Sequence, residues 1–179
     1  MFRPSASAIK ITSFIVLTML LIGYWLWTTD RNWKFVYAAG HGDLAKVRAG
    51  LDSGIDPNRA SMKGATALDF ATNSRKPGQP EIIRLLVDRG ADPNKGVSKA
   101  AAGQPPDTIR FLLDRGANPT SGLCSAVDAN RPGIVQLLIA RGADVNAKCD
   151  SPSRSVLLEA AGYSSNEIIR MLKAAGARK

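Results

Sequence analysis

The chain has 179 residues, with 24 Lys and Arg against 15 Asp and Glu and a formal net charge of +9. This length allows one domain plus an appendage, and the basic balance favours an acidic protein, an anionic lipid or a nucleic acid as partner. There is one histidine, His41, and two cysteines, Cys124 and Cys149, which lack the spacing of metal ligands. These counts argue against a histidine-based catalytic triad, a metal site and a disulfide framework.

The segment 11–29, ITSFIVLTMLLIGYWLWTT, contains no charged residue. As a helix it would span about 28 Å, which matches the hydrocarbon core of a bilayer. A buried core helix and a cleaved signal peptide are the alternatives. Tyr24, Trp25 and Trp27 near its end suit a membrane interface better than a cleavage site. We therefore predict an N-terminal tail at 1–10 and an uncleaved transmembrane anchor at 11–29.

The positive charges on the two sides of this anchor, which set its orientation, are nearly balanced. Arg3 and Lys10 precede the apolar segment, whereas Arg31 and Lys34 follow it. A short basic tail ahead of a folded domain favours the signal-anchor arrangement, with the N-terminus inside. We expect a single-pass protein of the bacterial inner membrane, with its C-terminal domain in the periplasm.

The rest of the chain repeats one helical pattern that ends at a glycine. In the second copy, Ile82, Ile83, Leu85 and Leu86 form one apolar helical face. The glycine suits the left-handed position after a helix, and an Asp-Pro or Asn-Pro turn usually follows. The copies read DLAKVRAGLDSGIDPN (43–58), EIIRLLVDRGADPN (81–94), DTIRFLLDRGANPT (107–120), GIVQLLIARGADVN (133–146) and EIIRMLKAAGA (167–177).

A shorter helix rich in small residues is expected before each of these. Alanines let such an inner helix approach its neighbours closely, and two helices this short must stack on further copies to bury their apolar faces. The inner helices are expected around residues 35–39, 68–71, 97–101, 123–127 and 157–161.

Two motifs resemble those of the ankyrin repeat family. GATALDFA at 64–71 is similar to the family's G-x-T-P-L-H-x-A, with Ala for Pro and Asp for His, and the ending LLVDRGADPN at 85–94 recurs as LLIARGADVN at 137–146. The resemblance covers about residues 33–177. It implies an all-α protein, an ankyrin-type α-solenoid of about five helix-turn-helix repeats behind the transmembrane helix. The repeat domain would occupy 30–179, with repeats at about 33–58, 59–94, 95–120, 121–146 and 147–179.

Two repeats are shorter than the family's. Gly90, Gly116 and Gly142 are spaced 26 residues apart, and the missing residues fall between the turn glycine and the next inner helix. The deletion therefore removes the hairpin finger that ankyrin repeats project between units. We expect a notch on this side of the stack, between the fingers at 59–63 and 148–154. The second repeat instead carries extra residues in the loop at 74–80.

No catalytic constellation or phosphate-binding loop is present in the pattern, so we predict no enzyme, cofactor, metal or small-molecule substrate. The outer helices carry a row of polar residues that could bind lipid headgroups or an acidic partner: Arg48, Arg84, Arg110, Gln136 and Arg170. The simpler interpretation is a solvated face with i,i+4 ion pairs, which would be Arg48–Asp52, Arg84–Asp88 and Arg110–Asp114. These aspartates argue against nucleic acid as partner.

Cys124 begins an inner helix and Cys149 lies in the following finger. In an oxidising compartment they could pair if the finger folds back. Equivalent positions in adjacent repeats are too far apart for a disulfide, so we favour two unpaired thiols.

The resemblance implies a non-enzymatic protein–protein interaction module tethered to a membrane. The alternatives are an inhibitor or immunity-type protein that blocks a periplasmic enzyme, and a structural subunit of a membrane complex. Such solenoids bind through finger tips and the inner-helix edge. The corresponding candidate partner-binding residues are Arg59, Ser61, Met62, Lys63, Asn73, Ser74, Asp128, Lys148, Asp150, Arg154 and Tyr163.

Overall fold

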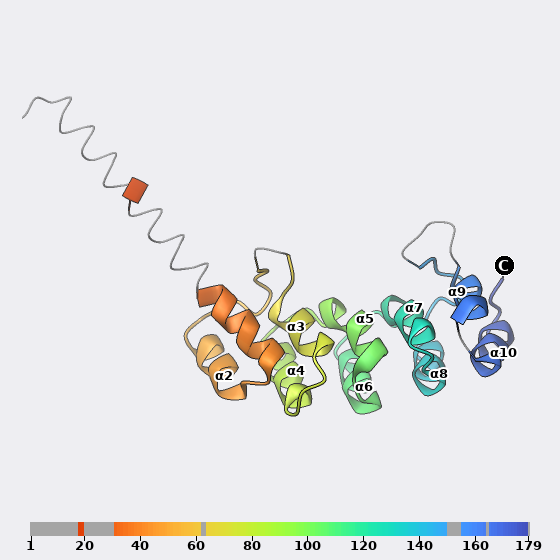
Figure 1. Ribbon diagram of the computed structural model, residues 1–179, viewed down its shortest axis with the longest axis horizontal. Coiled ribbons are helices and arrows are strands. Elements are labelled where there is room, and N and C mark those ends of the chain that lie inside the picture. Colours follow the sequence, from red (N-terminus) through yellow and green to blue (C-terminus); the bar gives the residue numbers. More distant parts are fainter. Residues whose placement is uncertain (1–17, 20–30, 62–63, 150–154, 164, 179) are drawn as a thin grey trace, which may run out of the picture.

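The computed structural model describes residues 18–19, 31–61, 64–149, 155–163 and 165–178, which form a row of helix pairs (Figure 1). Residues 31–41 are helical and pair with the helix α2. The elements are α2 (Leu44–Asp52), α3 (Ala67–Asn73), α4 (Gln79–Asp88), α5 (Asn94–Gly103), α6 (Pro106–Asp114), α7 (Thr120–Asp128), α8 (Pro132–Ala140), α9 (Val156–Tyr163) and α10 (Asn166–Ala174). The expected all-α stack of helix pairs is confirmed.

The predicted anchor at 11–29 lies outside the described residues, except for Thr18 and Met19. Within the part of the chain that the structure describes, no helix is both long enough and apolar enough to cross a membrane.

The inner helices pack closely because small residues face one another. A Cβ atom at Gly96 in α5 would lie 2.9 Å from side-chain carbons of both Leu68 and Thr72 in α3. One at Gly122 in α7 would lie 3.2 Å from the Cβ of Ala101 in α5. Real side chains do not tolerate the first contact, so glycine sets the spacing between α3 and α5.

The outer helices fill the space behind with larger side chains. Ile82, Ile83 and Leu86 of α4 are fully buried, as expected, whereas Leu85 is only partly buried. Gly90 follows α4 with a φ of 93°, in the left-handed conformation that favours glycine. Ala91 N–H then donates to the Leu86 carbonyl at 2.9 Å, which closes the helix end.

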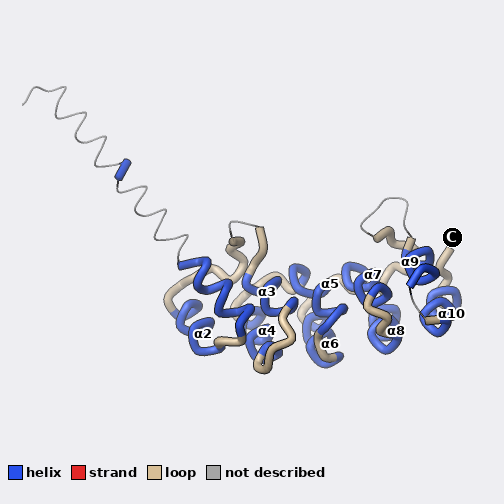
Figure 2. The backbone as a smooth tube through the Cα atoms, viewed as in Figure 1, coloured by secondary structure: helices blue, strands red, loops and turns tan. Residues whose placement is uncertain are grey.

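The finger deletion is also confirmed. The connections before α3 (53–66) and before α9 (141–155) are long, whereas those before α5 (89–93) and α7 (115–119) contain only the turn. Figure 2 shows the described parts of the two long connections on the same side of the stack.

A side chain in each turn binds the backbone of the next turn. Asn58, Asn94, Thr120 and Asn146 stand four residues after successive turn glycines. Their side-chain oxygens accept hydrogen bonds from the backbone N–H groups of the following turn. The acceptor–donor pairs are Asn58–Asp92 (2.7 Å), Asn94–Asn118 (2.8 Å), Thr120–Asp144 (2.9 Å) and Asn146–Arg178 (2.8 Å). These four bonds, the turn ladder, explain the asparagines of the repeated ending.

The predicted i,i+4 ion pairs are wrong. Each aspartate at the end of an outer helix instead pairs with the arginine just before the next repeat's turn glycine. The pairs are Asp52–Arg89 (2.8 Å), Asp88–Arg115 and Asp114–Arg141 (2.7 Å). The short aspartate lies at the end of its helix, where the next repeat stacks, so the neighbouring repeat supplies the nearest cation. Of the expected cations, Arg110 pairs with Asp107 and Arg84 lies over the Phe111 ring.

Two loop residues bind backbone carbonyl groups at the end of the inner helix in the previous repeat. The Gln104 side chain is 3% exposed, and its Nε2 donates to the carbonyl groups of Thr72 at 2.9 Å and Ser74 at 2.6 Å. Arg131 donates to the Ala101 carbonyl at 2.9 Å. Burial lowers the pKa of the Arg131 guanidinium, and the nearby charge of Arg75 lowers it further.

Candidate protein-binding groove

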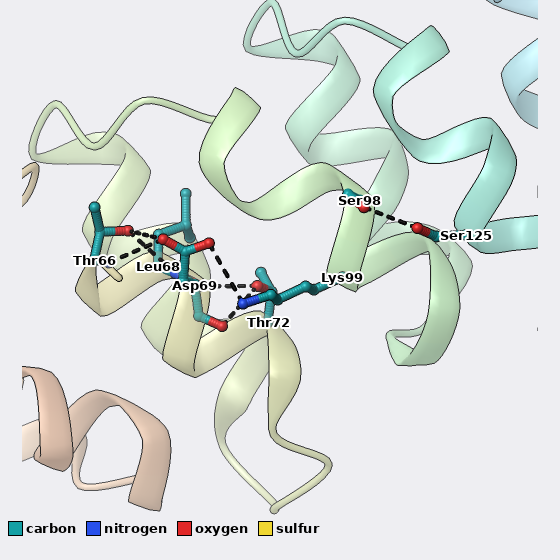
Figure 3. A network of polar contacts seen from close by, with 7 residues as sticks. All are labelled: Thr66, Leu68, Asp69, Thr72, Ser98, Lys99 and Ser125. Atoms are coloured by element: carbon teal, nitrogen blue, oxygen red, sulfur yellow. Dashed lines mark hydrogen bonds and ion pairs between the residues drawn. The ribbon is translucent and has the colours of Figure 1, made fainter. Parts of the chain in front are cut away.

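The inner-helix edge is polar and ordered by hydrogen bonds between repeats (Figure 3). Asp69, which replaces the histidine of the family motif, accepts from the Thr66 N–H at 2.9 Å, while Thr66 Oγ1 accepts from the Asp69 N–H at 3.2 Å. This capping box starts α3. Along the same edge the hydroxyls of Ser98 in α5 and Ser125 in α7 lie 2.8 Å apart.

A groove of about 550 Å³ opens beside this edge, over the two repeats without fingers. It runs from α5 across α7 to the last finger and α9. Its lining residues are Ser98, Thr120, Ser121, Cys124, Ser125, Asp128, Ala147, Lys148, Cys149 and Glu159. This is the position expected for the notch, although the groove lies toward the last finger, and no described residue of the first finger lines it.

Hydroxyl groups and three charged side chains define the chemistry of the groove. Asp128 at the end of α7 and Lys148 on the finger are exposed, whereas Glu159 in α9 is only 7% exposed. Such a mixture of donors and acceptors with both charges suits an extended polar segment of polypeptide. Within the described residues, no three histidine, cysteine or acidic side chains come together as a metal site.

The two cysteines form a disulfide, so the expectation of unpaired thiols is wrong. The Cα atoms of Cys124 and Cys149 are 5.7 Å apart. The two cysteines occupy different positions in their repeats: Cys124 lies in α7, and Cys149 lies in the finger that leads to α9. An isolated antiparallel bridge joins Lys148 to Ser155, and the disulfide holds Cys149 of the finger beside α7. The disulfide thus ties one wall of the groove to its floor.

Among the predicted site residues that the structure describes, Asp128 and Lys148 line this groove. Arg59 and Ser61 lie on the first finger, and the Ser61 N–H donates to the Ala65 carbonyl at 2.8 Å. Asn73 ends α3 and Ser74 follows it, where its carbonyl accepts from Gln104. Tyr163 is the last residue of α9. Four predicted residues lie outside the described part: Met62, Lys63, Asp150 and Arg154.

Sequence reasoning missed the hydroxyl residues Ser98, Thr120, Ser121 and Ser125 and the buried Glu159. A signal was available for the first group. Ser98, Ser121 and Ser125 are hydroxyl residues within inner helices that also contain alanine and glycine, NKGVSKAAAG and TSGLCSAVD. Nothing local in the sequence marks Glu159, because the other residues of the groove come from α5, α7 and the finger.

Stacked helix pairs joined by hydrogen-bonded turns define the class of the protein, an α-solenoid repeat protein. The family model described as ankyrin repeat matches residues 63–96 and 123–150. The chain contains ankyrin repeats, which indicate a protein–protein interaction module. No curated protein matches the chain.

Proposed function

We propose that this protein is a membrane-tethered recognition module whose groove receives a segment of a protein partner. The observation that carries this proposal is the groove itself. Three consecutive repeats contribute its polar side chains, at the place where the finger deletion leaves the inner helices open. The mechanism is binding by a stacked scaffold, with no chemical turnover.

Two observations support a membrane-attached, extracytoplasmic location. The apolar segment 11–29 is long enough for an anchor. The disulfide between Cys124 and Cys149 favours an oxidising compartment, since such bonds are rare where cellular thiols remain reduced. We therefore propose the bacterial inner membrane, with the repeats in the periplasm. A C-terminal alkaline phosphatase fusion should be active, and an inactive fusion would contradict this placement.

Site-specific photo-crosslinking tests the groove. A benzoyl-phenylalanine residue replaces Ser121 in the groove or, as the matched control, Arg110 on the exposed face of α6. In intact membranes we expect a discrete adduct from position 121 that is lost when Lys148→Glu and Asp128→Lys are added. The same adduct from position 110, or an adduct insensitive to the charge changes, would contradict the proposal.

The same experiment separates an adaptor from an inhibitor. Mass spectrometry identifies the adduct, and an enzyme whose activity falls when the purified chain is added would indicate the inhibitor. An unaffected partner would indicate the adaptor.

A further inference from the structure

The helix at residues 31–41, in the first repeat of the stack, carries exposed aromatic side chains. Trp33 and Tyr37 are each 48% exposed, whereas Phe35 and Val36 on the other face are 4% and 0% exposed. The first repeat of a solenoid normally presents a polar outer face, because nothing stacks upon it. An aromatic face at this position therefore indicates contact with something else.

These aromatic residues form an ordered row. The ring centroids of Trp33 and Tyr37 are 5.9 Å apart, and those of Tyr37 and His41 are 3.7 Å apart in a stacked arrangement. Trp33 also meets Phe70 of α3 edge-on at 6.4 Å. Together with Lys34 and Lys46, the row lines a shallow hollow of about 390 Å³.

Charged side chains border this row. Lys34 and Lys46 line the hollow together with Asp43. The Lys46 ammonium donates to Asp43 Oδ2 at 2.6 Å, and this hydrogen bond lowers the pKa of the Asp43 carboxyl and raises that of Lys46. The carboxylate is thus held within an ion pair with Lys46.

We propose that the row Trp33–Tyr37, with Lys34, lies in the headgroup region of the membrane and holds the first repeat against the lipid surface. The proposal rests on the proposed anchor. Trp33 follows the predicted end of the anchor, Thr29, by four residues, which is about 6 Å of helix and at most about 14 Å of extended chain. The headgroup region extends about 5–8 Å beyond the hydrocarbon core.

Tryptophan and tyrosine prefer this region because their rings are apolar and their N–H and O–H groups are polar. The basic residues add attraction to anionic lipids. The contact makes the first repeat part of the membrane attachment. The recognition groove between α5 and α9 would then stand away from the lipid, farther along the stack (Figure 1).

Fluorescence of the full chain in vesicles tests this contact. With Trp25→Phe and Trp27→Phe, Trp33 becomes the only tryptophan. The vesicles contain phosphatidylcholine and phosphatidylglycerol brominated either near the headgroup or at the chain end. We expect a larger loss of Trp33 emission with bromine near the headgroup, and little quenching by aqueous iodide.

A probe far from the membrane provides the control. Leu158 in α9 is 58% exposed, so Leu158→Trp combined with Trp33→Phe in the same background should be quenched by iodide and unaffected by bromine. Iodide quenching of Trp33 in vesicle-bound protein would overturn the headgroup contact while leaving the anchor intact. Emission that varies with protein-to-lipid ratio would overturn it in favour of a second copy. Protein that fails to float with vesicles after a high-salt wash would overturn the anchor and the contact together.

Discussion

The repeats with fingers and the repeats without them share one stacking arrangement. The helix pair α5–α6 has lost its finger, and α3–α4 has kept it, yet both end in the same glycine turn and both carry the turn ladder. The finger is therefore dispensable for stacking. Its removal changes the surface, because it uncovers the inner-helix edge where the groove lies.

The two fingers also differ from each other. The last finger is tied to α7 by the disulfide and lines the groove, whereas the first is closed by local backbone bonds such as Ser61 N–H to Ala65 O. The two cysteines thus attach the last finger to a neighbouring inner helix, whereas this bond of the first finger lies within its own loop.

The largest expected effect comes from the core of a repeat without a finger. Leu123 in α7 and Leu68 in α3 are both fully buried at equivalent positions. Leu123→Ala should lower the free energy of unfolding by about 2–5 kcal/mol, because it leaves a cavity. If fingers are dispensable for stacking, Leu68→Ala should cost the same. Urea denaturation measures both changes.

The control for these variants is Leu158→Ala, which alters an exposed side chain and should stay within about 0.5 kcal/mol of the unaltered protein. A much smaller loss for Leu68→Ala than for Leu123→Ala would show that the first finger supports its repeat, and the comparison would fail.

Removal of the disulfide should have the next largest effect. The bond joins residues 25 apart in the sequence, and Cys124→Ser with Cys149→Ser should destabilise the fold by about 2–4 kcal/mol, since the unfolded chain gains freedom. Denaturation under non-reducing conditions measures this loss. Trypsin should also cleave faster after Lys148, with no change after Arg59 on the first finger. Unchanged cleavage at Lys148 would mean that the finger does not depend on the disulfide.

The turn ladder should contribute less, and equally in both kinds of repeat. Asn94→Ala removes the acceptor for the Asn118 N–H, and Asn58→Ala removes the acceptor for the Asp92 N–H. Each should cost about 0.5–1.5 kcal/mol in thermal or chemical unfolding. Lys95→Ala, at an exposed neighbouring position, serves as control. A loss confined to Asn58→Ala would show that the ladder supports only the repeat with a finger.

The smallest effect is expected for the ion pairs between outer helices. Arg141 and Asp114 are 37% and 62% exposed, so Arg141→Gln should cost only about 0.2–1 kcal/mol at low salt. The loss should disappear near 1 M salt, where the screening length is about 3 Å. A double-mutant cycle with Asp114→Asn measures the pair, and a coupling that persists at high salt would contradict a screened surface pair.

Much of the fold could be predicted because its signals are local. Gly90 marks a helix end since only glycine adopts its φ of 93° without strain. Pro106 marks a helix start, because its missing N–H costs nothing there. The spacing of Gly90, Gly116 and Gly142 located the missing fingers. Each of these signals is a residue type or a spacing along the chain, so it can be recognised in the sequence.

The candidate site was less predictable because its members come from separate repeats. Asp128 and Lys148 were predicted from their places on the inner-helix edge and finger, yet Glu159 and the serines of α5 and α7 were missed. The pairing of Asp114 with Arg141 was also missed, because a helical period shows only partners within the same helix.

The sequence by itself determined the helix pairs, their ends, the repeat register and the loss of two fingers, since these depend on neighbouring residues along the chain. Tertiary structure alone decided that Cys149 reaches Cys124 and that a polar groove opens over α5 and α7. It also decided that ion pairs such as Asp114–Arg141 join the outer helix of one repeat to the next repeat. The physical reason is that these contacts depend on how one repeat stacks on the next and on where a finger folds back. Neither property is encoded in the period of a single helix.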